Sequence, residues 1–168
     1  MQGRIVQINL SKGGIPKLPV PSGRATTLGL EGDACRNLKY HGGPLKALLL
    51  VSLEDIELLR QQGFDVFPGA LGENLTVERL PFRDLRPGMR YRTGEAAIEL
   101  TKLRTPCSTL DVYNRPGLGR IQDAVYDARV KAGDATSPRW GLAGFYASVE
   151  HPGLIRTGDI IKLLDQAV

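Results

Sequence analysis

The feature that most restricts the fold of this chain is the frequency of residues that interrupt regular structure. Its 168 residues include 20 glycines and 11 prolines, about half as many again as the roughly 12% that average proteins carry. Glycine weakens helices and strands, and proline removes a backbone donor. The chain therefore has little room for long helices, and we expect many short strands joined by turns.

The composition is that of a folded protein. Apolar residues make up 42% and charged residues 24% of the chain, which excludes a disordered polymer. The length predicts a single domain over residues 1–168. The longest apolar run, Ala47 to Val51, is far below the ~20 residues of a membrane span, and no apolar signal segment follows the start. We therefore expect a cytoplasmic location without a membrane partner.

Apolar patterning and turn residues predict the secondary structure. Strands are expected at 4–10, 45–52, 74–77, 89–92, 96–103, 144–149 and 154–164, the last interrupted at 157–159. Helices are expected at 53–62, between the N-cap Ser52 and Gly63, and at 119–130. Residues 11–22 are expected to be an extended loop. Seven or eight short strands favour a mainly β fold, a single barrel with a few short helices, and a sandwich stays open.

Of the two cysteines, Cys107 is the better candidate for a reactive or metal-binding thiolate. Pro106 ends regular pairing just before it, and Lys102 and Arg104 lie within five residues along the chain. Positive neighbours stabilise the thiolate, which is the form that attacks or binds metal. Cys35 also has basic neighbours, so this local argument does not fully separate the two. Two cysteines are too few for a disulfide framework.

Other chemistries find less support. The chain has no phosphate-binding G-x-x-x-x-G-K-[ST] loop, no G-x-G-x-x-G fingerprint and no C-x-x-C pair. A three-ligand zinc site of Cys35, His41 and Cys107 stays open as a minor alternative. The net charge of +4 suits an anionic partner. The arginines of the stretch 79–92 are interrupted or flanked by the acidic residues Glu78, Asp84 and Glu95, and the ten aromatic residues scattered along the chain give no obvious stacking platform. We therefore expect a solvated face and no nucleic-acid partner.

Four polar clusters interrupt the apolar pattern, and each is ordinary when taken alone. Gly42 and Gly43 permit a positive φ and a close backbone approach, so their amides could face an anion. Of the other clusters, one places a carboxylate and a carboxamide before a predicted strand, and one places a cysteine after a predicted strand. The last is a turn near the C-terminus. The clusters are Gly29 to Asp33 with His41-Gly42-Gly43-Pro44, Gly69 to Asn74, Arg104-Thr105-Pro106-Cys107, and Pro152 to Asp159.

In this order and at these spacings, the clusters resemble the MOSC family (molybdenum cofactor sulfurase C-terminal domain), in its small stand-alone bacterial type. The matching pieces span residues 29–159, most of the chain. The resemblance implies a β-barrel that holds the molybdenum cofactor (molybdopterin) with the motif cysteine, here Cys107, bonded to molybdenum. It further implies reduction of a small-molecule N-hydroxylated substrate, such as a hydroxylaminopurine or a hydroxylamine, with electrons from a separate redox protein.

The family motifs carry over to particular residues. Cys107 is the implied catalytic residue and metal ligand, and soft thiolate ligation suits a transition metal. Lys102 and Arg104 would serve as donors to a buried pterin phosphate, together with the glycine-rich loops. Ser148 stands where many relatives carry Arg. The full set implied to bind the cofactor is Asp33, His41, Gly42, Gly43, Glu73, Asn74, Lys102 and Arg104.

Two alternatives keep the fold and change the role. In one, Cys107 carries a persulfide and the protein transfers sulfur that a partner supplies. In the other, the protein holds the pterin as a carrier without turnover. We also expect Asp33, His41, Glu73, Asn74, Arg104 and Cys107 to face one cleft, with Cys35 at its rim, because active sites collect loop residues on a rigid scaffold.

Overall fold

The computed structural model describes residues 1–34 and 42–164. Seven strands form a closed barrel because β1 pairs with β6 on one side and with β11 on the other. The mainly β barrel that the sequence predicts is confirmed, and the sandwich is not observed. Around the barrel the strand order is β1 (Gln2–Leu10), β11 (Ile160–Leu163), β7 (Arg90–Thr93), β8 (Ala96–Leu103), β9 (Phe145–His151), β5 (Leu48–Ser52) and β6 (Leu75–Glu78).

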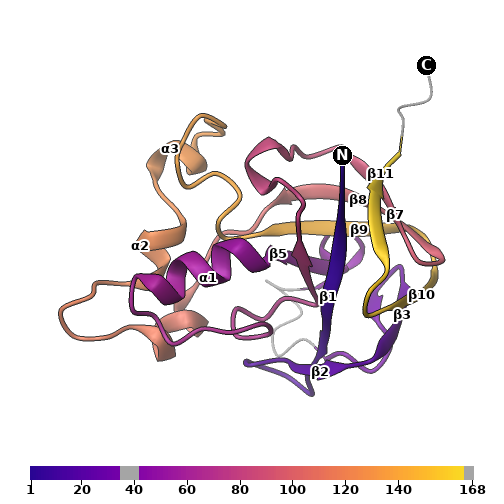
Figure 1. Cartoon of the computed structure of the whole chain (residues 1–168), viewed down its shortest axis with the longest axis horizontal. Coiled ribbons are helices and arrows are strands. Elements are labelled where there is room, and N and C mark those ends of the chain that lie inside the picture. The colour runs from indigo at the N-terminus through magenta and orange to yellow at the C-terminus, as the bar shows by residue number, and fades with distance from the viewer. Residues whose placement is uncertain (35–41, 165–168) are drawn as a thin grey trace.

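Smaller elements flank the barrel. The strand β2 (Leu18–Val20) extends the sheet beyond β1, and β3 (Ser22–Thr26), β4 (Gly29–Leu30) and β10 (Gly153–Arg156) form a separate three-stranded sheet. The helices α1 (Leu53–Gln61), α2 (Ile121–Val125) and α3 (Ala128–Lys131) gather on one side of the barrel (Figure 1). The part of the chain that the structure describes also contains three 3₁₀ turns: η1 (Pro44–Lys46), η2 (Phe82–Asp84) and η3 (Ser108–Tyr113). None of the helices in the described residues is long and apolar enough to cross a bilayer.

Strand β5 separates two hydrophobic cores. Its five residues are all buried, as expected for a strand covered on both faces. Leu48 and Leu50 belong to the core inside the barrel. Leu49 and Val51 belong to a second core, which they share with residues of α1, η3 and α2. The strand therefore connects the barrel interior to the helical side of the molecule.

Helix α1 forms where local signals predict it. The Ser52 Oγ accepts a hydrogen bond from the backbone N–H of Asp55 at 3.2 Å, which satisfies one of the free amides of the first turn. After the helix, Gly63 adopts a φ of 105°, a conformation that glycine enters without strain. Because α1 crosses between β5 and β6, these two strands pair in parallel.

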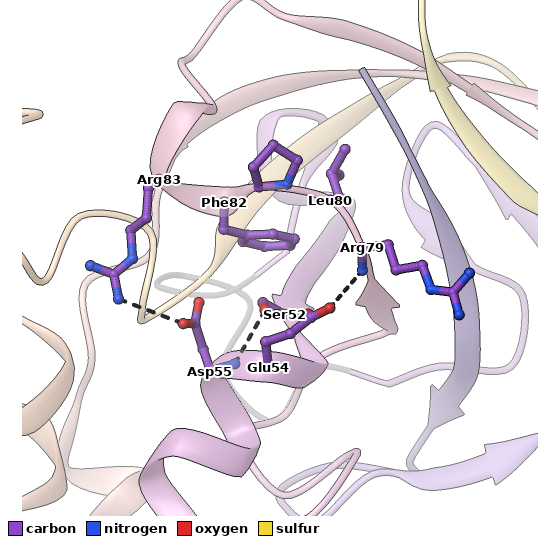
Figure 2. Close-up of a pocket in the computed structure, with 8 residues that line it drawn as sticks. Ser52, Glu54, Asp55, Arg79, Leu80, Phe82 and Arg83 are labelled. Carbon is purple, nitrogen blue, oxygen red and sulfur yellow. Dashed lines mark hydrogen bonds and ion pairs between the residues drawn. The ribbon is translucent and has the colours of Figure 1, made fainter.

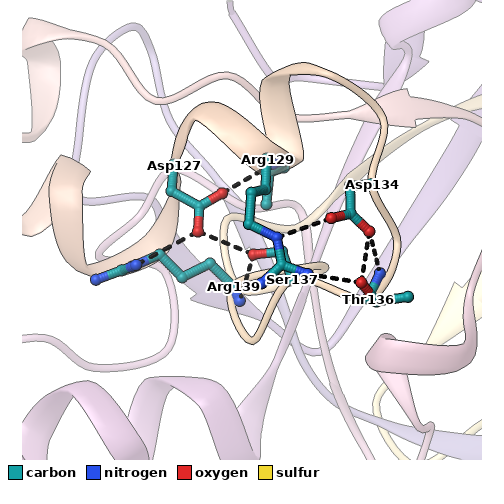
Figure 3. A network of polar contacts seen from close by, with 7 residues as sticks. Asp127, Arg129, Asp134, Thr136, Ser137 and Arg139 are labelled. Carbon is teal, nitrogen blue, oxygen red and sulfur yellow. Dashed lines mark hydrogen bonds and ion pairs between the residues drawn. The ribbon is translucent and has the colours of Figure 1, made fainter.

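The single helix predicted at 119–130 is wrong, because the segment forms two short helices. Tyr126 and Asp127 between them are extended. The Asp127 Oδ1 accepts from Val130 N at 2.8 Å and caps α3, while its Oδ2 accepts from Ser137 Oγ and Arg139 Nη1 (Figure 3). Aspartate in this role competes with a continuous helix.

The N-terminal loop prediction also needs correction. Within 11–22, residues 18–20 pair with β1 as β2. This is an edge strand, and Pro19 is tolerated there because an edge position needs no donor on its outer side. The predicted strand 45–52 begins with the 3₁₀ turn η1 and becomes β5 at Leu48. The strands predicted at 96–103 and on both sides of the turn at 157–159 are confirmed.

Candidate functional site

Asp33 lies in a buried polar network with three residues from two other segments. The Lys17 Nζ contacts both of its carboxylate oxygens, at 2.6 and 2.5 Å, and Asn74 Nδ2 donates to Oδ2 at 2.8 Å. Ser11 N donates to Oδ1 at 2.9 Å. The structure thus joins Asp33 directly to Asn74, and the protein's own donors engage both oxygens of Asp33. Asp33 therefore stabilises this region through hydrogen bonds inside the protein.

Asn74 fixes the start of the parallel strand pair. Its Oδ1 accepts from the backbone N–H of Leu49 at 3.1 Å, and its own backbone N–H donates to the Leu49 carbonyl at 2.9 Å. Asn74 is thus bonded to β5 and to Asp33 at once. The local reason is that Asn74 directly precedes β6, where an amide side chain can complete the ladder.

Glu73 is completely buried. Its Oε1 accepts from Gly69 N at 2.6 Å and from Thr76 Oγ1 at 3.0 Å, whereas no described residue hydrogen-bonds to Oε2. Burial raises the pKa of this carboxyl above its usual range, opposed by its hydrogen bonds and by the Arg104 charge. Glu73 and Arg104 therefore lie within electrostatic range of each other.

Arg104 is a buried cation with free donors. It is 4% exposed, and its Nε and Nη1 have no hydrogen-bond partner in the part of the chain that the structure describes. Its backbone N–H donates to the Gly144 carbonyl at 2.9 Å. Gly144 is needed there because its φ is 91° and a Cβ would lie 2.4 Å from the Leu50 carbonyl oxygen. The approach of Gly144 to β5 thus sets where Arg104 enters the core.

Cys107 follows at the junction between β8 and η3. It is partly exposed, and its Sγ lies 3.0 Å from the Thr109 Oγ1. Its carbonyl accepts from Leu110 N at 3.1 Å and from Gln122 Nε2 at 3.1 Å. The thiol therefore sits at the surface of a segment whose backbone is bonded to the helical side of the molecule.

Buried polar atoms without partners concentrate around this segment. Buried polar groups are normally hydrogen-bonded. Within the described residues five buried side-chain atoms lack a partner: Thr93 Oγ1 and a group of four, namely Glu73 Oε2, Arg104 Nε and Nη1, and Gln122 Oε1. Of these four, two are donors on a cation and two are acceptors. Arg104 precedes Cys107 by three residues, and Gln122 contacts Cys107 directly. This set suits a ligand that carries both an anionic or carbonyl acceptor and amine donors, so the donor set beside Cys107 fits a pterin-type group.

Lys46 is a neighbour of the site that sequence reasoning missed. Its Nζ lies 5.5 Å from the centre of the Tyr146 ring, a cation–π distance. Its pKa is lowered by burial and by the adjacent charge of Lys102. Two ammonium groups held together favour an anionic group beside them. Its position in the sequence could have indicated it, since Lys46 follows Pro44 of the glycine motif by only two residues.

The remaining predicted residues are placed as follows. Gly42 and Gly43 have φ values of 95° and 84°, which confirms the predicted backbone, and an added Cβ at Gly43 would meet no atom within 4 Å. His41 and Cys35 lie outside the described residues, so the single cleft and the zinc alternative stay predictions. Ser148 lies on β9 and donates to Glu150 Oε1 at 2.8 Å.

A surface hollow of about 460 Å³ lies elsewhere, where α1 begins (Figure 2). None of the predicted site residues lines it. Its wall includes an ion pair, since Arg83 Nη2 lies 3.7 Å from Asp55 Oδ1. Burial raises the pKa of Asp55 to about 6, against the opposing charge of Arg83. The hollow is lined by Ser52, Glu54, Asp55, Arg79, Leu80, Pro81, Phe82 and Arg83.

Comparison with known proteins supports the resemblance seen in the motifs. The family model described as the MOSC domain matches residues 37–162. The protein YiiM of Escherichia coli is 38% identical over 93 residues, which cover 52% of this chain and 41% of YiiM. The uncharacterized protein YflK of Bacillus subtilis is 29% identical over 137 residues, which cover 81% of this chain and 56% of YflK. The chain thus spans about half the length of these curated relatives.

Solved structures share the fold. The crystal structure of YiiM from Geobacillus stearothermophilus superposes with a TM-score of 0.71 at 25% identity, covering 99% of this chain and 77% of that one. The YUAD protein from Bacillus subtilis gives a TM-score of 0.68 at 21% identity, covering 96% of this chain and 94% of that one. The second of these similarities concerns the fold alone.

Proposed function

The chain belongs to the MOSC-domain family, and on that premise we propose that it binds the molybdenum cofactor and reduces N-hydroxylated small molecules, with Cys107 as the molybdenum ligand. The substrates are of the hydroxylaminopurine and hydroxylamine class. Reduction of such a compound breaks one N–O bond, takes up two electrons and two protons, and releases water and the amine. The bound cofactor would supply the two-electron chemistry.

The observation that carries this proposal is the buried guanidinium of Arg104, three residues before a partly exposed thiol. Its Nε and Nη1 have no hydrogen-bond partner among the described residues. An unpaired buried donor is costly, on the order of 1–3 kcal/mol, and more for a charged group. Such a group is stabilised when an anion or carbonyl completes its hydrogen bonds. The pairing of a thiol with such donors supports a cofactor that has a soft metal and polar ring atoms.

The chain's own residues would divide the remaining tasks. Arg104, together with Lys46 and Lys102, would hold the anionic part of the cofactor. Gly42 and Gly43 would allow backbone amides to approach it. Asp33 and Asn74 would keep the surrounding loops in place through the network with Lys17, and Glu73 would present its free Oε2 as a hydrogen-bonding atom in the core.

Because this chain spans only about half the length of its curated relatives, the source of the electrons is also part of the proposal. We infer a separate redox protein as the electron donor, as the resemblance to the MOSC family implies. The two alternative roles predict different contents for the purified protein. A sulfur carrier would contain a persulfide on Cys107 without metal, and a passive carrier would contain the cofactor without turnover.

The test uses protein made in cells that synthesise molybdopterin. We expect wild type to contain molybdenum and to reduce a hydroxylaminopurine with a chemical electron donor. Cys107→Ser should lose both, because a serine oxygen is harder than a thiolate and stays protonated. Cys35→Ser is the matched control and should keep most of both. An active wild type without molybdenum would overturn the proposal, and a persulfide on Cys107 without metal would favour the sulfur carrier.

A further inference from the structure

The segment that carries Cys107 has a long-range tether on the helical side of the molecule. Gln122 lies on α2, fifteen residues further along the chain, and its Nε2 donates to the Cys107 carbonyl at 3.1 Å. A second bond to this carbonyl, from Leu110 N at 3.1 Å, is local to η3. Gln122 therefore connects the backbone at Cys107 to a separate element of the structure.

The Gln122 side chain is itself held in one orientation. It is 7% exposed, and its Nε2 also donates to Asp111 Oδ1 at 2.7 Å. Asn114 Nδ2 donates to the same Asp111 oxygen at 3.0 Å, and Asn114 Oδ1 accepts from Ile121 N at 2.8 Å. These bonds form a closed ring through η3 and the start of α2. Because both neighbours of Nε2 are acceptors, the ring also fixes which end of the amide faces Cys107.

A glutamine at this position brings a cost to the fold beside its two hydrogen bonds. Its Oε1 is buried and has no partner in residues 1–34 and 42–164, and an unsatisfied buried acceptor destabilises a protein. A hydrophobic side chain of the same length would avoid that cost, because the flanking residues Ile121 and Val125 belong to the second core. What such a side chain could not do is donate to the Cys107 carbonyl.

We propose that Gln122 is a positioning residue, which fixes the backbone at Cys107 and thereby the direction of its thiol. The inference rests on the proposed function for its catalytic consequence, but not for its structural one. Gln122 acts through the carbonyl of Cys107 and through Asp111, and not through contact with a substrate. Removal of its donor loses the bonds to the Cys107 carbonyl and to Asp111, while the local bond from Leu110 N to that carbonyl remains.

The first test measures the thiol without any cofactor. The full chain carrying Cys35→Ser is produced in cells that cannot make molybdopterin, and the rate of Cys107 alkylation by iodoacetamide is followed by intact mass at one pH. In Gln122→Met we expect roughly fivefold faster alkylation, the factor that corresponds to loss of one ordinary hydrogen bond. Asp123→Asn, an exposed change on the same helix, is the control and should match wild type.

The second test measures turnover of the molybdenum-loaded protein. Gln122→Met should lower kcat by about tenfold or more with KM nearly unchanged, because misplacement of a reacting group affects the transition state more than binding. Should Gln122→Met fail to fold, Gln122→Asn, whose shorter side chain cannot reach both acceptors, replaces it in both assays. An alkylation rate equal to that of wild type would overturn the inference. An inactive wild type would refute the proposed function and leave the alkylation result decisive for Gln122.

Discussion

The ion pair between Lys17 and Asp33 gives a sharp prediction about what holds the candidate site together. Both side chains are only 10% exposed, and Lys17 Nζ contacts both carboxylate oxygens. Removal of one partner of a buried pair costs about 3–5 kcal/mol, because a charge is left uncompensated. Asp33 would keep its bonds from Ser11 N and Asn74 Nδ2. We therefore expect Lys17→Met to reduce the free energy of unfolding by about 3 kcal/mol.

Urea unfolding monitors this change through the fluorescence of Trp140, the single tryptophan, which is buried. Adding Asp33→Asn to Lys17→Met removes the stranded charge and should restore about 1–2 kcal/mol. Lys12→Met, an exposed change in the same loop, is the control and should stay within about 0.5 kcal/mol of wild type. A Lys17→Met protein as stable as this control would refute the view that the buried ion pair of Asp33 stabilises the site.

Two further predictions concern stability elsewhere in the fold. Because the pKa of Asp55 is raised to about 6 in the folded protein from 3.8, the folded state binds the proton more tightly, so stability should fall by up to about 3 kcal/mol as pH rises from about 4 to about 6. Asp55→Asn should remove this part of the pH dependence of unfolding, and an unchanged profile would contradict it. Gly144→Ala should destabilise by about 2–5 kcal/mol, since its Cβ would clash with the Leu50 carbonyl at a φ of 91°. A calorimetric Tm close to that of wild type would contradict this prediction, because it would mean that β5 moves aside for the added Cβ at little cost.

Local signals account for the parts of the fold that the sequence predicts well. Helix α1 has its cap at Ser52 and its terminating glycine at Gly63, and both act within a few residues. The closure of the barrel depends on β1 pairing with two distant strands, which no local pattern encodes. The predicted helix at 119–130 failed because periodicity ignores the cap formed by Asp127, whose partners Ser137 and Arg139 lie beyond the segment.

In the candidate site, too, the sequence indicates some residues and misses those whose role depends on long-range contacts. The motifs indicated Asn74 and Asp33, which the structure joins directly. They did not indicate Lys17, whose loop position carries no signal until the chain folds it against Asp33. Gln122 was missed for a related reason, because its importance comes from a bond to a carbonyl and not from a motif of its own. Side chains that support a site by contact are found only from coordinates.

X-ray absorption at the molybdenum edge tests the central claim, that Cys107 is the protein ligand of a molybdenum cofactor. The measurement compares wild type with Arg104→Met and Cys107→Ser, all made in cells that synthesise molybdopterin. Wild type should contain molybdenum with one sulfur neighbour more than any metal retained by Cys107→Ser, and Arg104→Met should hold less metal with the sulfur count unchanged. An identical sulfur count in wild type and Cys107→Ser would contradict the account.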